Sequence, residues 1–225
     1  MNGNLFKKTV SKQCHFLIED GFALRMVDNR NFWFEKCEQE IGCRISFFIT
    51  EYGDTFHVMG LNVEKRFNRV EQHIQPVLND VELNTLYTIY KRPDIKHIPV
   101  ELKYDATESN IHFMIEEEQE LLLFLEFVQS FYYHTVIPFF EEYNNIEVVN
   151  KQLQNLLEEK KIQSLLTDSG GNSAILRYYV IGLICKNQFV IDFFENTYFP
   201  YISKEKSNLS IKEYNQLLAL KEQIG

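Results

Sequence analysis

The pattern of apolar residues changes near residue 110, and this change constrains the fold more than any other feature of the sequence. Before it, short runs rich in β-branched and aromatic residues alternate with polar ones, as is typical of strands with one buried face. After it, long stretches carry apolar residues at helical spacing. The sequence therefore predicts an α+β fold: residues 1–110 form a helix and an antiparallel sheet, and residues 111–225 form a helical layer packed on it as one merged domain.

Four strands joined by short polar turns are predicted in the first part. They cover residues 22–27, 32–37, 44–51 and 55–64, with turn-forming residues at 28–30 and 52–54. Two further candidates, 86–91 and 97–103, would extend this meander from four to six strands. Within 44–50, alternation assigns Ile45, Phe47 and Ile49 to a buried face and leaves the other, more polar set for the opposite face: Arg44, Ser46, Phe48 and Thr50.

Helices are predicted over 5–19 and 68–78, and then over 117–143, 146–159, 173–187, 189–202 and 211–224. In 117–143 the polar residues fall in one narrow sector of the helix, and nearly all others are apolar. We call this sector the polar stripe; its members are Glu126, Gln129, Ser130, Tyr133, His134 and Glu141. A helix with so narrow a polar stripe is expected to be surrounded on most sides, as the central element between the sheet and the later helices.

Composition and charge narrow the possible functions. The net charge is −9, and residues 116–225 carry 16 acidic and 9 basic residues, so a nucleic-acid partner is not expected. The N-terminal residues include Lys7, Lys8 and Lys12, where a signal peptide needs an apolar core. The apolar stretches 121–140 and 174–185 are too polar or too short to span a membrane. A cytoplasmic protein with reduced thiols and no membrane contact is expected.

Glu126, Ser130 and His134 recur every four residues, so their side chains share one face of the predicted helix. A serine, a histidine and a carboxylate together suggest a hydrolase. A serine inside a helix, however, lacks free N–H groups nearby to form an oxyanion hole. The sequence therefore favours a solvated or hydrogen-bonded stripe over a catalytic site.

Two further groups of residues suggest ligand sites. Cys37 and Cys43 lie on adjacent predicted strands, with His57 on the next, but no paired-ligand spacing is present, and small buried thiols are expected instead of a metal or redox site. The segment Asp168–Asn172 leads into a predicted helix and could receive an anion, although a turn between helices is favoured. No metal ion and no cofactor are expected.

Two surfaces are candidates for binding another protein. Phe32, Trp33 and Phe34 place large aromatic rings on both faces of one strand, which indicates either a covered sheet or an exposed docking surface. Glu116, Glu117 and Glu118 form a carboxylate run at the start of a predicted helix, where they also interact favourably with its dipole. An exposed carboxylate run would suit a basic partner.

Several segments together resemble a group of bacterial hypothetical proteins that consist of domains of unknown function. They are Gly21–Phe22, Phe32–Phe34, 45–50, 56–63 and 136–140, and the likeness in layout extends over about two-thirds of the chain. Members of this group pair a small antiparallel sheet with a helical C-terminal part. Some are suspected immunity proteins or accessory factors encoded near toxin genes, so the resemblance implies an immunity-like role.

The function expected from the sequence is a non-catalytic, cytoplasmic protein-protein interaction factor, which acts through its acidic helical half on a basic partner. Two alternatives remain open. One is a hydrolase-like enzyme that uses Glu126, Ser130 and His134, and the other is a protein that binds a small ligand at a site built from dispersed residues.

Overall fold

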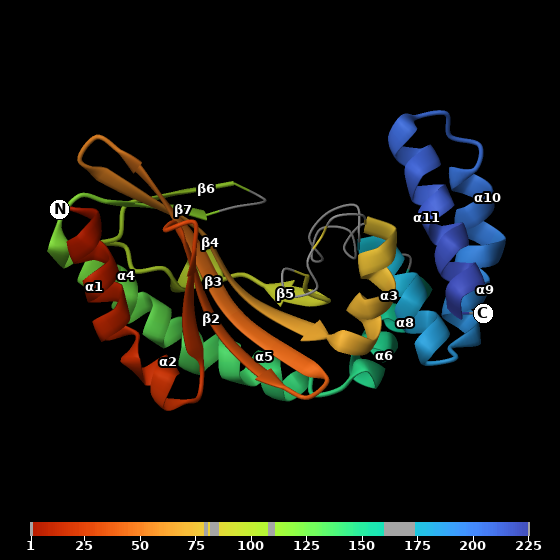
Figure 1. The fold of residues 1–225 in the computed structure, drawn as a ribbon, viewed down its shortest axis with the longest axis horizontal. Helices are drawn as coiled ribbons and strands as arrows, with labels where there is room; N and C mark the ends of the chain where they lie inside the picture. Colours follow the sequence, from red (N-terminus) through yellow and green to blue (C-terminus); the bar gives the residue numbers. More distant parts are fainter. Residues whose placement is uncertain (1, 79–80, 82–85, 108–110, 160–173, 225) are drawn as a thin grey trace. The chain divides into compact units, whose positions relative to one another are not determined.

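The computed structural model describes residues 2–78, 81, 86–107, 111–159 and 174–224 (Figure 1). The chain divides into two compact units. The first contains residues 1–64 and 91–141, and the second contains residues 65–90 and 142–225. The boundary expected at residue 110 falls inside the first unit, because the sheet receives another strand just after that position. The chain is α+β with an antiparallel sheet, as the sequence predicts.

Among the described residues, seven strands form the sheet, and the four strands of the predicted meander are all present. They are β1 (Ala23–Val27), β2 (Asn31–Glu38), β3 (Ile41–Tyr52) and β4 (Thr55–Phe67), joined in sequence by antiparallel hairpins. Three short strands follow: β5 (Ile89–Lys91), β6 (Tyr104–Ala106) and β7 (Ile111–Ile115). The order is β1-β2-β3-β4-β7-β6, and β5 pairs with β4.

The first hairpin turn shows how local sequence sets the register of the sheet. Asp28 and Asn29 both have positive φ angles, 53° and 56°, which non-glycine residues seldom adopt except Asn and Asp. Positive φ at both central positions gives a turn whose twist matches that of the flanking strands. Strand β1 consequently returns along β2 with Val27 opposite Asn31 and Leu24 opposite Phe34.

Helices of the first unit lie along one face of the sheet (Figure 1). They are α1 (Gly3–Gln13), α2 (His15–Glu19) and α4 (Glu118–Phe131). The Phe6 ring on α1 contacts the rings of Phe32 and Phe56, and the Phe124 ring on α4 contacts those of Phe47 and Phe113. These phenylalanines are almost completely buried and make up the core of the unit.

The opposite face of the sheet contains a buried ion-pair cluster, which corrects one expectation. Arg44 on β3 was expected on the open face, but its guanidinium donates to the Glu64 carboxylate on β4 and lies 3.6 Å from that of Glu35. The Trp33 ring covers Arg44, with the guanidinium carbon 4.3 Å from the ring centroid. Ser46 donates to the same Glu64 carboxylate. Both faces of β3 are therefore covered here, which strand alternation alone does not reveal.

Helix α4 continues through a π-helical segment, η3 (Tyr132–Val136), into α5 (Ile137–Glu142). The sequence predicts one continuous helix here. Pro138, however, has no N–H to donate, and in a regular α-helix its ring would clash with the backbone carbonyl of the residue four positions earlier. The backbone widens just before it, and Ile137 N–H donates to the carbonyl of Tyr132, five residues back. The same arrangement recurs at η4 (Phe194–Tyr198), which Pro200 follows at the same distance.

The second unit is largely helical. Its helices are α3 (Asn68–Leu78), α6 (Ile146–Glu158), α8 (Ala174–Ile184), α9 (Gln188–Phe193), α10 (Phe199–Ile202) and α11 (Asn208–Ile224). Helix α8 is the core element, because all residues from Ala174 to Gly182 are buried. It packs against α9 so closely that a Cβ atom at Gly182 would lie 2.7 Å from the Val190 side chain.

A second buried ion pair joins α3 to α8. The Arg177 guanidinium donates to both oxygens of the Glu71 carboxylate, at 2.8 and 2.9 Å, and the two residues are 4% and 0% exposed. The Thr88 hydroxyl also donates to Glu71, at 2.8 Å, and accepts from the backbone N–H of Phe67. This network ties the segment before β5 to the two helices.

Two expectations on secondary structure were wrong. Residues 97–103 were predicted to form a strand, but Ile95–His97 form a 3-10 turn, η2, and no strand follows until Tyr104. Asp94 starts this turn by accepting a hydrogen bond from the N–H of Lys96. Strand β7 falls in the half that was expected to be helical, although Ile111, Phe113 and Ile115 show the alternation of a strand. Among the described residues, no helix has the length and apolar character needed to cross a membrane.

Candidate binding pocket on helix α4

The polar stripe predicted from the sequence forms the exposed face of α4, η3 and α5. All six of its residues, from Glu126 to Glu141, are exposed, whereas the apolar residues between them are mostly buried. Tyr133 is the largest side chain of the stripe and is 51% exposed. The amphipathic pattern therefore located the exposed face of the helix correctly.

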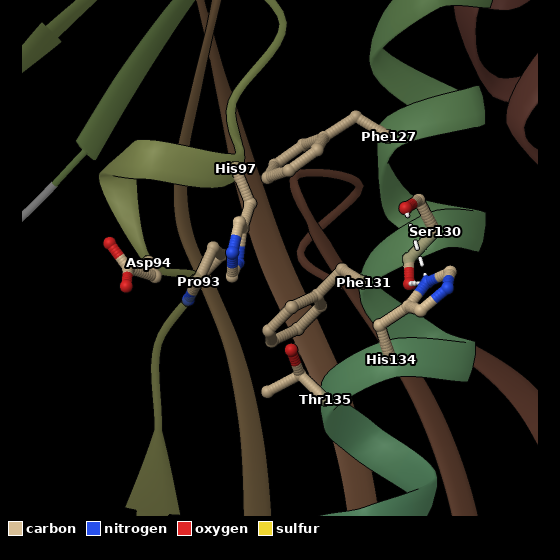
Figure 2. A pocket seen from close by; sticks show the side chains of 8 residues that line it. All are labelled: Pro93, Asp94, His97, Phe127, Ser130, Phe131, His134 and Thr135. Carbon is tan, nitrogen blue, oxygen red and sulfur yellow. Dashed lines mark hydrogen bonds between the residues drawn. The ribbon is translucent and has the colours of Figure 1, made fainter.

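A pocket of about 360 Å³ lies beside this stripe, between the end of α4 and the η2 segment (Figure 2). We call it the α4 pocket. One wall consists of Pro93, Asp94 and His97, and the other of Phe127, Ser130, Phe131, His134 and Thr135. Pro93, Phe127 and Phe131 are buried and make an apolar floor. Asp94, His97, Ser130 and His134 are exposed and make a polar rim.

Asp94 is held in place by the backbone but keeps part of its carboxylate available. Its Oδ1 accepts from the N–H of Lys96, and its backbone carbonyl accepts from the N–H of His97. Within the part of the chain that the structure describes, the second carboxylate oxygen has no hydrogen-bond partner. In Figure 2 this carboxylate points away from the α4 wall, and the side chains of Pro93 and His97 are nearer to that wall.

The geometry of Ser130 and His134 argues against a catalytic pair. His134 Nδ1 lies 2.9 Å from the carbonyl oxygen of Ser130 and 3.4 Å from its hydroxyl. A carbonyl oxygen only accepts, so Nδ1 carries the hydrogen and donates it to the backbone (Figure 2). In this arrangement the nitrogen nearest the serine hydroxyl cannot take its proton.

Glu126 does not complete a triad with these residues. Its side chain is exposed, does not line the α4 pocket, and forms no hydrogen bond or ion pair within the described ranges. The spacing of four residues brings Ser130 and His134 into contact but leaves Glu126 one turn away. His134 is therefore hydrogen-bonded to the helix backbone, and Glu126 is exposed to solvent.

The carboxylate run at the start of α4 has a structural role. The Glu117 side chain and Glu120 form a capping box, in which the Glu120 carboxylate accepts from the N–H groups of Glu116 and Glu117. The bond from the Glu116 N–H is the main reason that the pKa of Glu120 is lowered. Lys103 pairs with Glu116 and Glu120 at 3.2 and 3.1 Å. Glu116, Glu117 and Glu118 are all exposed, so they remain accessible to a partner.

The aromatic run on β2 does not form one docking surface. Phe32 and Phe34 are fully buried in the core, and a partner cannot reach them. Trp33 points to the opposite face and is half-buried over Arg44. Of the two interpretations left open by the sequence, the structure agrees with the covered sheet.

The register of the β2–β3 hairpin places Cys37 and Cys43 one position apart across the two strands. Cys37 lies opposite Gly42, and Lys36 lies opposite Cys43, so the two cysteines are on different faces of the hairpin. Cys37 is exposed, contrary to the expectation of small buried thiols. Among the described residues, no three histidine, cysteine or acidic side chains are grouped to hold a metal ion. Burial raises the pKa of the Cys14 thiol to about 12, which leaves it protonated and unreactive.

Sequence reasoning missed one wall of the α4 pocket. Pro93, Asp94 and His97 are some 30 residues before the α4 wall, and nothing in their spacing indicates which element they approach. The sequence does show that Pro93 and Asp94 are turn-forming residues, and that Phe127 and Phe131 are spaced to lie on one face of a helix. The anion site suggested at Asp168–Asn172 lies outside the described residues.

Comparisons of this chain with protein-family models, with curated proteins and with solved structures found no match. The resemblance to bacterial proteins with domains of unknown function therefore stays a prediction. The function has to be inferred from the chemistry of the exposed face of α4 and of the α4 pocket.

Proposed function

We propose that this chain is a non-catalytic, cytoplasmic protein-binding factor, and that it binds a basic partner through the exposed face of α4, η3 and α5. The observation that carries the proposal is the charge of this region. From Glu116 to Glu141, the segment that contains α4, η3 and most of α5, the sequence has six carboxylates and neither lysine nor arginine. Lys103 pairs with two of the six, Glu116 and Glu120. A long, exposed surface of one sign speeds association with a surface of opposite sign and disfavours other partners.

The geometry of the polar stripe supports binding over catalysis. The His134 ring donates a hydrogen bond to the backbone carbonyl of Ser130. Glu126 and Glu141 form no hydrogen bond or ion pair with the described side chains. Exposed Tyr133 lies between them on the stripe. An exposed tyrosine among carboxylates is suited to the centre of a protein interface, where tyrosine is enriched. An immunity-like role on a basic toxin surface would be one instance of this function.

Charge reversal on the stripe tests the proposal. The tagged protein is purified from its native cells at low salt, beside the Glu126→Lys/Glu141→Lys variant. The control is Glu205→Lys/Glu222→Lys, which changes the net charge equally at other exposed positions. We expect a stoichiometric basic protein that is recovered with wild type and with the control, but not with the stripe variant or after a high-salt wash.

Two outcomes would contradict the proposal. One is the recovery of the same partner with the stripe variant as with wild type, which would exclude this surface. The other is the absence of any stoichiometric partner. Reversal of Glu116 or Glu117 is less informative, because these residues also pair with Lys103 and cap α4.

A further inference from the structure

One sequence pattern occurs once in each unit. Residues 127–138 and 189–200 both read Phe-Val-x-x-Phe-x-x-x-Thr-x-x-Pro. The backbone repeats with the sequence, because the π-helical segments η3 and η4 occupy the same positions of the pattern. The two copies are therefore equivalent position by position.

The first copy supplies the α4 wall of the α4 pocket, so the second copy contains an equivalent wall. Of the five residues that line the pocket from α4, three are identical in the second copy. We call the five counterparts the α9 wall; they are Phe189, Asp192, Phe193, Asn196 and Thr197.

The two walls differ in how far they are covered. Phe127 and Phe131 are each 4% exposed, and the side chains of Pro93 and His97 face them across the α4 pocket (Figure 2). On the α9 wall, Phe189 is 44% exposed, and the three polar members are exposed as well. The α9 wall is thus open to solvent where its counterpart lies opposite a proline-containing segment.

We propose that the α9 wall binds a proline-containing, basic segment of a partner protein. This segment takes the place that residues 91–97 have in the first unit. The inference does not rest on the proposed function, because it concerns a surface of the other unit.

Aromatic rings extend the α9 wall in a form that suits proline. The ring centroids of Phe193 and Tyr198 are 6.5 Å apart, and so are those of Tyr198 and Tyr201. Tyr201 is 62% exposed, whereas its counterpart Phe139 is 3% exposed. Surfaces lined by aromatic rings bind proline-containing segments, because these segments are already extended and lose little conformational entropy.

The charge of the α9 wall suits a basic segment. Asp192 is exposed and provides a carboxylate where the α4 wall has a serine. Residues 188–202 contain two carboxylates and neither lysine nor arginine, and Lys221 pairs with one of the two, Glu195. Residues 91–97 contain three lysine or arginine side chains and one carboxylate. A segment of this kind is therefore complementary to Asp192 in charge.

A peptide copy of the segment in the first unit tests the proposal. A blocked peptide with the sequence of residues 91–98 is titrated into the full-length protein at low salt, and binding is followed through the NMR shifts of backbone amides. We expect saturable shifts at residues 188–201. The same peptide with Pro93→Ala should bind about fivefold more weakly, because it loses the preformed extended backbone.

Matched variants of the protein assign the binding to the α9 wall. Phe189→Ala removes its exposed ring and should weaken peptide binding at least about tenfold. Asp192→Asn should weaken it about threefold and reduce its dependence on salt. The control is Met26→Ala, which truncates an apolar side chain of similar exposure, 45%, in the first unit and should change nothing.

Three outcomes would overturn this inference. One is the absence of saturable shifts at residues 188–201. Another is shifts confined to residues 127–135, which would mean that the peptide only replaces its own segment in the first unit. The third is self-association of the free protein that Phe189→Ala abolishes, which would mean that a second copy covers the α9 wall. The Glu126→Lys/Glu141→Lys variant should bind the peptide as wild type does, so either proposal can fail without the other.

Discussion

The two units each contain a buried arginine-glutamate pair, and the pairs differ in how well they are enclosed. Arg177 and Glu71 meet in a two-bond arrangement that Thr88 completes, and Glu71 has no exposed surface. Arg44 and Glu64 lie on a sheet face, where Glu64 keeps 7% exposure and a second carboxylate, Glu35, competes for the arginine. Removal of the arginine is therefore expected to cost different amounts of stability in the two pairs, although the interacting groups are the same.

Removal of Arg177 should have the largest effect. Arg177→Met keeps an apolar stem but removes the guanidinium. The Glu71 carboxylate then stays buried with the hydrogen bond from the Thr88 hydroxyl and without an opposite charge. We expect a loss of about 3–5 kcal/mol in the free energy of unfolding, measured by denaturant titration with circular dichroism. The double variant Glu71→Leu/Arg177→Met, which removes both charges, should recover most of that loss. A single variant as stable as wild type would show that the pair is dispensable.

Removal of Arg44 should cost less. In Arg44→Met, Glu64 can take up a proton, because burial already raises its pKa against the opposing effect of Arg44. The Ser46 hydroxyl still donates to it. We expect a loss of about 1–3 kcal/mol in the same titration. A loss as large as that of Arg177→Met would contradict the proposed difference between the two pairs.

The pH dependence of stability should reveal Glu64 directly. Its pKa is raised in the folded state, so the folded protein binds more protons than the unfolded chain in the range above the ordinary value near 4.5. This group therefore favours folding below that value, and its contribution falls as the pH rises through the raised pKa. We expect Glu64→Gln to lose this slope. The free energy of unfolding of wild type and of Glu64→Gln is measured by denaturant titration at several pH values. The same pH dependence in both proteins would contradict this prediction.

Replacement of the aromatic cover should have the smallest effect. Trp33 is the only tryptophan of the chain, and its ring stacks over Arg44. Trp33→Phe keeps an aromatic face of smaller area, so we expect a loss of about 0.5–1 kcal/mol. In wild type, Trp33 fluorescence should change on Arg44→Met but not on Arg177→Met. A response to both variants would mean that Trp33 does not report on the Arg44 pair alone.

The strands and helices that could be predicted are those fixed by local signals. Asp28 and Asn29 mark the first hairpin turn, and the spacing of apolar residues along α4 located its exposed stripe. The remaining features depend on contacts between distant residues. Alternation assigned Arg44 to a face, but only the structure shows that Glu64 and Trp33 cover it. The pocket wall at Asp94 and His97 has the same origin, because no local pattern brings it to α4.

The π-helical segment before Pro138 has a consequence for chain length. A π turn closes over five residues where an α turn closes over four, so η3 holds about one residue more than a regular helix would. A variant with Tyr133 deleted and Pro138 replaced by alanine is one residue shorter and should extend α4 into α5 at regular pitch. If η3 arose by a one-residue insertion, homologous chains without the proline should show a one-residue gap at this position. The same expectation applies to η4 before Pro200.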